Sequence, residues 1–287
     1  MGRGAVYAIA AAACFAVMGG FIKLAAVELP NTMVVFLRNS LGFLFLLPWI
    51  LRFGTRNLRT RRPGMHLLRC LFGLSAMYCF FYAIPRMDLA IAVLLNYSAP
   101  LFIPVIALLW LREQSPNLIY LSILAGFIGV ALIVKPAQGD TTLSALAALA
   151  GLASGILAAM AMVSIRRMSD TEPAVRIVFY FTLFGCLISA LPLFITWQTP
   201  SHIVLLWMIG AGACASAGQL LLTRAYSLAP ASRVAALAYT SVIFAGLIGW
   251  ALWQEKPDLM SFAGMLIIMT TGMIAIQARA HQTEIRS

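Results

Sequence analysis

Apolar segments about 20 residues long follow one another from end to end of the chain, with short polar turns between them. A segment of this length can cross the hydrocarbon core of a bilayer as an α-helix. Hydrophobic residues make up 62% of the chain and charged residues only 10%, whereas soluble domains carry about 25% charged residues. A chain this apolar cannot bury its hydrophobic surface in one soluble core, so the sequence predicts a polytopic membrane protein.

Helices rather than strands are the predicted elements, which makes the expected fold class all-α. No segment alternates apolar and polar residues as a membrane strand does, and open sheet edges cannot lie in lipid. Breaks at Pro, Gly, Asn and charged residues divide the chain into ten predicted transmembrane helices. A cleavable signal peptide at Gly4–Phe21 is the weaker alternative, because the apolar pattern continues to the end. The predicted spans are 4–27, 31–52, 66–85, 88–111, 116–135, 142–164, 173–196, 203–226, 231–253 and 258–278.

Basic residues lie mainly on one side of the predicted membrane. If the N-terminus is inside, the outer loops hold only Arg86, Lys135 and Lys256 of the 20 Lys and Arg residues, while three others lie within spans. This asymmetry predicts a multi-pass protein of a bacterial-type inner (plasma) membrane with both termini in the cytoplasm. It also accounts for the net charge of +11, because the inner loops face anionic membrane lipids. A nucleic-acid partner is not expected, since the basic residues are scattered over several loops.

The two halves of the chain resemble each other at an offset of 142 to 143 residues. LLNYSAPLFIPVIALLWLREQSP (Leu94–Pro116) aligns with ALAYTSVIFAGLIGWALWQEKPD (Ala236–Asp258). The sequence therefore predicts a first five-helix repeat, 1–137, and a second, 138–287, which together form one transport unit. Because five is odd, the second repeat enters the membrane with inverted topology, as in many secondary transporters. The aligned pairs include Tyr97 with Tyr239, Glu113 with Glu255, Pro30 with Pro173, Phe36 with Phe179 and Gly42 with Gly185.

Several motifs in this arrangement are similar to those of the drug/metabolite transporter superfamily, and the chain resembles its ten-helix EamA-type carriers. The resemblance implies a carrier for small metabolites that works by alternating access, with a central cavity bounded by spans one, three, four, six, eight and nine. It also implies relatives that export amino acids or metallophores, or that import S-adenosylmethionine, riboflavin or choline. The motifs are FLRN (Phe36–Asn39), APLFIPVIALLWLRE (Ala99–Glu113), GFIGVALIVKP (Gly126–Pro136) and QEKPD (Gln254–Asp258).

Polar residues inside the predicted spans are the candidate substrate-binding residues, because such residues usually face a cavity or a partner. Arg38 lies about 10 Å from the outer end of span two, at 1.5 Å per residue. It also departs from the repeat, since Phe181 occupies the aligned position. The alternatives for Arg38 are to tie helices together through Asn39, to stand behind the cavity wall, or to reach the lipid headgroups. The full set of candidates is Lys23, Arg38, Tyr78, Tyr82, Asn96, Tyr97, Gln219 and Tyr239.

Each of the other candidates also has a structural alternative. Lys23 is shallow enough to extend to the headgroups, and the tyrosines can pack in the core. Gln219 can form an interhelical hydrogen bond among small residues. In span four, Pro100 and Pro104 are expected to break or bend the helix, because proline has no N–H to donate to the preceding turn.

The interiors of the predicted spans lack acidic and histidine residues, which limits the reactions and coupling mechanisms that the protein can use. The acidic residues and His66, His202 and His281 fall in loops or at span ends, and no catalytic motif, metal-ligand spacing or cofactor fingerprint is present. We therefore expect no enzyme activity, no cofactor and no metal, and we interpret the five cysteines as packing residues. Proton coupling would have to use Glu28, Asp88 or the substrate itself, which favours a uniporter or an exchanger.

A cavity with cations and no acidic residue favours anionic cargo. The predicted function is export of an anionic or zwitterionic amino-acid derivative, such as an amino acid or a metallophore. The alternative is uptake or exchange of a cationic or aromatic nutrient such as S-adenosylmethionine or riboflavin, with the tyrosines as a cation–π cage. Small-residue pairs such as Gly151 and Gly155 allow close helix contacts within one chain or between two, so a homodimer stays open.

Overall fold

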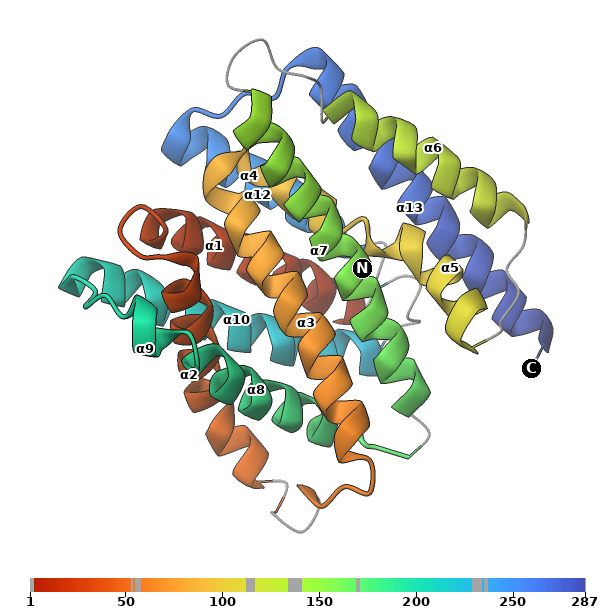
Figure 1. Cartoon of the computed structure of the whole chain (residues 1–287). Helices are drawn as coiled ribbons and strands as arrows, with labels where there is room; N and C mark the ends of the chain where they lie inside the picture. Colours follow the sequence, from red (N-terminus) through yellow and green to blue (C-terminus); the bar gives the residue numbers. More distant parts are fainter. Residues whose placement is uncertain are drawn as a thin grey trace.

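The structure is a computed structural model that describes residues 3–52, 54, 58–111, 117–133, 141–168, 171–228, 234 and 237–286. Every regular element within these ranges is a helix (Figure 1), which confirms the all-α class. The elements are α1 (Arg3–Ala25), α2 (Asn31–Arg52), α3 (Pro63–Ala83), η2 (Ile84–Arg86), α4 (Leu89–Asn96), α5 (Ala99–Leu111), α6 (Asn117–Ile133), α7 (Thr141–Met168), α8 (Ala174–Ala190), α9 (Leu193–Thr196), α10 (His202–Leu228), α12 (Thr240–Trp253) and α13 (Leu259–Arg286).

The helices have the length and surface of membrane helices. Among the described residues, six helical segments are long and apolar enough to cross a bilayer, one of them being α4 and α5 together, and three apolar helices of 10–17 residues accompany them. Large apolar side chains on their outer faces are exposed, among them Leu109 at 78% and Leu121 at 64%. Water would strongly disfavour such a surface, whereas lipid accommodates it. The protein is therefore a polytopic membrane protein, and the count of ten spans stays a prediction.

Small residues set the closest helix packing. α1 lies along α10, α3 along α7, and α6 along α13. The pair of α6 and α13 forms one edge of the molecule in Figure 1. A Cβ added at Gly212 of α10 would lie 2.7 Å from Leu41 of α2, and one at Gly155 of α7 would lie 2.6 Å from the carbonyl oxygen of Leu95. Glycine at these positions lets the backbones approach, as is common between membrane helices.

Two of the predicted spans are interrupted. Span four consists of α4 and α5, separated at Tyr97 and Ser98, with Pro100 in the first turn of α5, where its missing N–H leaves no helical hydrogen bond unmade. Pro104 lies inside α5. The prediction of one helix over 173–196 is wrong: α8 ends at Ala190 and Pro192 starts the separate short helix α9.

Candidate functional site

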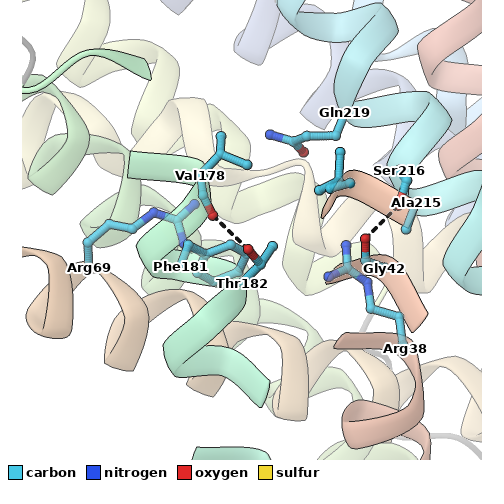
Figure 2. A pocket seen from close by; sticks show the side chains of 10 residues that line it. Arg38, Gly42, Arg69, Val178, Phe181, Thr182, Ala215, Ser216 and Gln219 are labelled. Atoms are coloured by element: carbon cyan, nitrogen blue, oxygen red, sulfur yellow. Dashed lines mark hydrogen bonds between the residues drawn. The ribbon is translucent and has the colours of Figure 1, made fainter. Parts of the chain in front are cut away.

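A small cavity lies between α2, α3, α8 and α10, and two arginines enter it from opposite sides (Figure 2). Its volume is about 30 Å³, which is enough for about two water molecules, since each needs about 10–15 Å³ of such space. α8 and α10 each contribute residues that lie one turn apart and therefore share one helix face. We call it the arginine cavity. Its polar lining is Arg38 from α2, Arg69 from α3, Thr182 from α8, and Ser216 and Gln219 from α10.

Arg38 forms a hydrogen bond to the residue that follows it in the chain. Its Nη1 donates to Oδ1 of the adjacent Asn39 over 3.0 Å. Its Nε is buried and has no hydrogen-bond partner in the part of the chain that the structure describes, and the same holds for Nδ2 of Asn39. The Asn39 amide therefore accepts from one N–H of the guanidinium group, but it is neutral and does not compensate the positive charge of Arg38.

Arg69 lies with its guanidinium carbon 3.6 Å from the centre of the Phe181 ring. This stacking uses the flat face of the group and leaves its N–H edges free to donate. Nε and Nη1 are buried and have no hydrogen-bond partner within the described ranges. Gly73, one turn further along α3, makes room for the group, because a Cβ there would lie 2.8 Å from Nη1 and 2.9 Å from the Phe181 ring.

No acidic side chain lines the arginine cavity among the described residues. The two hydroxyl groups in its wall already donate their protons to backbone carbonyls: Ser216 to Gly42 over 3.0 Å, and Thr182 to Val178 over 3.0 Å. Two guanidinium charges thus share a low-dielectric space without a counter-charge, and such a space has a strongly positive potential.

A second buried cation has the opposite surroundings. Lys23 of α1 donates from Nζ to the carboxylate of Glu255 and to the carbonyl oxygen of Met87, the latter over 2.7 Å. The other carboxylate oxygen of Glu255 accepts the N–H of Leu89, the first residue of α4, over 2.8 Å. We call this group, Lys23, Glu255 and the backbone of Met87 and Leu89, the Lys23 clasp. It joins α1 and α4 to the chain that follows α12.

Glycine and a left-handed residue make the Lys23 clasp possible. Gln254 has a φ of 57°, which turns the chain back at the end of α12. The N–H of Glu255 then donates to the carbonyl oxygen of Gly249 over 3.2 Å. A side chain at Gly249 would collide with the Glu255 carboxylate. The alternative in which Lys23 extends to the lipid headgroups is therefore wrong.

Glu172 and Glu255 lie outside the predicted spans, as the sequence predicts for the acidic residues, but both carboxylates are largely buried. Glu255 pairs with Lys23 although it follows a helix end. Glu172 is 4% exposed; its carboxylate accepts hydrogen bonds from Arg176 over 2.8 Å and from Thr60 over 2.7 Å. Burial alone would raise the pKa of Glu172, but these donors and His66 lower it below its ordinary value.

The two acids named for proton coupling differ in their surroundings. The carboxylate of Glu28 accepts hydrogen bonds from the backbone N–H and the hydroxyl of Ser201 over 2.6 and 2.7 Å, and these donors lower its pKa. Asp88, beside the Lys23 clasp, has a raised pKa because of burial and then because of the charge of Glu255. Of the two, Asp88 has the surroundings that favour a bound proton.

The remaining predicted residues are spread over several places. Tyr97 ends α4, Tyr239 precedes α12, and their ring centroids lie 6.4 Å apart. Tyr239 is 2% exposed, and its hydroxyl is buried against Gly272 without a hydrogen-bond partner in the described part of the chain. Asn96 donates to Ser154 of α7 over 3.1 Å.

Tyr78 and Tyr82 lie on α3 and not in the arginine cavity. The hydroxyl of Tyr78 is buried and has no partner among the described residues. The ring of Tyr82 stacks on Arg86, whose guanidinium carbon is 3.7 Å from the ring centre. Of the eight predicted residues, Arg38 and Gln219 are the two that line the arginine cavity.

Sequence reasoning missed Arg69, which is one of the three basic residues within predicted spans but is not among the eight candidates. A signal was present: Arg69 lies six residues inside α3, and Gly73 follows one turn later on the same face. An arginine side chain can lie along its own helix and pack against a neighbouring one where a glycine one turn away leaves room for it. The described residues contain no group of three or more His, Cys, Asp or Glu residues that could hold a metal ion.

The chain is similar to known transporters over nearly its whole length. The sequence profile of the EamA-like transporter family matches residues 2–135 and 145–276. The pseudopaline exporter CntI of Pseudomonas aeruginosa is 32% identical over 268 residues, which cover 93% of each chain. A riboflavin transporter of Vibrio cholerae is 27% identical over 93% of this chain and 90% of its own. An S-adenosylmethionine uptake transporter of Rickettsia conorii is 25% identical over 85% of this chain and 82% of its own.

Proposed function

This chain belongs to the EamA-like transporter family, and we propose that it exports an anionic or zwitterionic amino-acid derivative, a metallophore being the first candidate. Transport of small metabolites follows from the family and its relatives. The observation that carries the finer proposal is the arginine cavity: two buried guanidinium groups with no acidic side chain in the described lining. A positive potential inside the bundle attracts a negatively charged cargo.

The membrane potential supports the direction. Moving one net negative charge outward gains about 2.3 kcal/mol per 100 mV when the inside is negative. An anionic cargo can therefore leave the cell without a coupled proton. The name of the pseudopaline exporter, a relative with 32% identity, agrees with export of a metal-chelating compound.

Contacts between the two predicted repeats support alternating access, in which one repeat rocks against the other. Tyr97 and Tyr239, which occupy the same repeat position, face each other across 6.4 Å. Two equivalent residues can meet in this way only near the pseudo-two-fold axis. In the predicted orientation, with both termini cytoplasmic, the Lys23 clasp closes the outer end by tying α1 and α4 to the end of α12. Its release would open the outer side.

Counterflow in proteoliposomes tests the function. Vesicles containing the purified protein are preloaded with pseudopaline, S-adenosylmethionine or riboflavin, and uptake of the same labelled compound is followed. We expect exchange with pseudopaline and an outward flux of it that increases when the interior is made negative. Vesicles without protein are the control. Exchange with neither pseudopaline nor any amino-acid-derived anion in a wider panel would refute the proposal.

Uptake or exchange of an aromatic or cationic nutrient is the second candidate, and the Tyr97–Tyr239 pair favours it. Two aromatic rings can hold a planar or cationic ligand between or above them. Relatives named for riboflavin and S-adenosylmethionine transport agree with this reading. The same counterflow assay separates the two, because this candidate predicts exchange with riboflavin or S-adenosylmethionine and none with pseudopaline.

A further inference from the structure

We propose that the arginine cavity is a carboxylate-binding subsite, in which Arg38 and Arg69 together bind one carboxylate group of the transported molecule. This proposal rests on the proposed function and deepens it, since it names the group of the cargo that is recognised and adds Arg69 as a binding residue. Contact between α2 and α10 does not depend on the arginines, because Ser216 of α10 donates a hydrogen bond to the carbonyl oxygen of Gly42 in α2.

The free N–H groups match the ligand. Nε of Arg38 and Nε and Nη1 of Arg69 are buried without a hydrogen-bond partner in the described part of the molecule. A carboxylate has two oxygens that can accept about four hydrogen bonds, and guanidinium groups bind it in the forked geometry that both partners favour. Buried donors without a hydrogen-bond partner destabilise the protein. One carboxylate can accept from one edge of each guanidinium group and neutralises half of the charge.

The surroundings also select against other ligands. The Phe181 ring covers the face of the Arg69 guanidinium, so the group can offer only its edge. The hydroxyl protons of Ser216 and Thr182 point at backbone carbonyls, and no described acidic side chain lines the cavity to receive a cation. A cationic group here would meet two positive charges. The subsite therefore requires an anionic group on the cargo.

Size shows how much of the cargo enters. A cavity of about 30 Å³ holds about two water molecules or a single small functional group, not a metabolite. The rest of the cargo must therefore lie outside this cavity, where helices separate. Gln219, one turn beyond Ser216 on α10, lines the same cavity and offers both an amide donor and an acceptor.

The predicted repeat supports a role in binding over one in folding. Arg38 aligns with Phe181 at the offset of 143 residues, and Arg69 aligns with Ala211 or Gly212 at an offset of 142 or 143. A fold built from two equivalent halves needs these charges in neither half, because the second half is built without them. Here Phe181, the counterpart of Arg38, stacks on Arg69. The first predicted repeat thus supplies both charges of the cavity lining, and the second supplies the ring on which Arg69 stacks.

Thermal stabilisation of the purified protein in detergent tests the subsite without knowledge of the natural cargo. The probes are citrate and succinate, compared with succinamide and with chloride at equal ionic strength. We expect a rise in melting temperature with the carboxylates only. Arg38→Gln and Arg69→Gln should each remove most of it, whereas Arg61→Gln, the same change at an exposed position, should leave it intact. Gly73→Ala should reduce it by at least half, because the added methyl displaces the Arg69 guanidinium.

Conservative variants keep the test decisive if either glutamine variant fails to fold. Arg38→Lys and Arg69→Lys retain the charge but lose the forked donor geometry, so we expect a weakened carboxylate shift and a KM for transport raised about tenfold at little change in kcat. Undiminished carboxylate shifts in Arg69→Gln and Arg69→Lys would overturn the subsite. If the variants keep their carboxylate shifts and the parent protein transports pseudopaline, the subsite is wrong but the proposed function stands. If the variants lose the shifts and the parent protein transports no anion, the proposed function is wrong but the subsite stands.

Discussion

Lys23 and Arg38 are both cations within predicted membrane spans, but their surroundings are opposite. Lys23 meets a carboxylate and a backbone carbonyl, and it also interacts electrostatically with Asp88. Arg38 meets a neutral amide and a second arginine across a small cavity. A cation with more than enough counter-charge stabilises a closed structure, whereas a cation without any keeps a site ready for an anion. The two regions should therefore respond to mutation with opposite signs.

The largest effect is expected from Glu255→Gln. The change leaves Lys23 buried without its counter-charge, and breaking a buried pair from one side is unfavourable by about 3 kcal/mol. The melting temperature should fall by about 6–12 °C, since 1 kcal/mol corresponds to about 2–4 °C for a chain of this size. Fluorescence-detected unfolding in detergent measures it. The double variant Lys23→Met, Glu255→Gln removes both charges and should recover most of the loss; no recovery would show that the ion pair is not the cause.

Arg38→Gln should act in the other direction on the ligand-free protein. Removing a charge without a counter-charge from the membrane interior should stabilise the fold by about 1–2 kcal/mol, as changes at strained functional sites often do. The melting temperature should rise by about 2–8 °C while pseudopaline transport is lost. A fall in stability comparable to that of Glu255→Gln would mean that Arg38 ties helices together instead of binding cargo.

Tyr239→Phe tests a buried polar atom without charge. The hydroxyl has no hydrogen-bond partner among the described residues and lies against Gly272, so its removal should stabilise the protein by about 1 kcal/mol. Unfolding in detergent and counterflow are measured together. Higher stability with normal transport would assign Tyr239 to packing, and a loss of transport would assign it to the cargo. Lower stability would show that the hydroxyl has a partner that stabilises the fold.

The contrast between the two regions shows what a single sequence can predict here. Hydrophobic segments of fixed length identify the helices, and a charge inside such a segment identifies Arg38 and Lys23 as exceptions. Their partners cannot be found in this way. Glu255 reaches Lys23 across 232 positions, because a left-handed residue turns the chain at Gln254. Arg69 was missed for a related reason: the helical period gives its face, but only the packing of α8 shows that this face meets Phe181.

Asp88→Asn should have the smallest effect, and its sign depends on pH. Burial and then the charge of Glu255 raise the pKa of Asp88 above its ordinary value of 3.8, so the folded protein favours the protonated acid. Ionisation therefore destabilises the fold as the pH rises from the unfolded-state pKa through the folded-state pKa, and the full loss is present at neutral pH. The asparagine variant avoids this loss, and its melting temperature should exceed that of the parent by about 1–2 °C at pH 7 and by less at pH 4. Paired unfolding curves at the two pH values measure the difference. An advantage that is equal at both would assign the effect to helix capping at the start of α4, and a disadvantage at pH 7 would show that the Lys23 clasp uses the charge of Asp88 alongside that of Glu255.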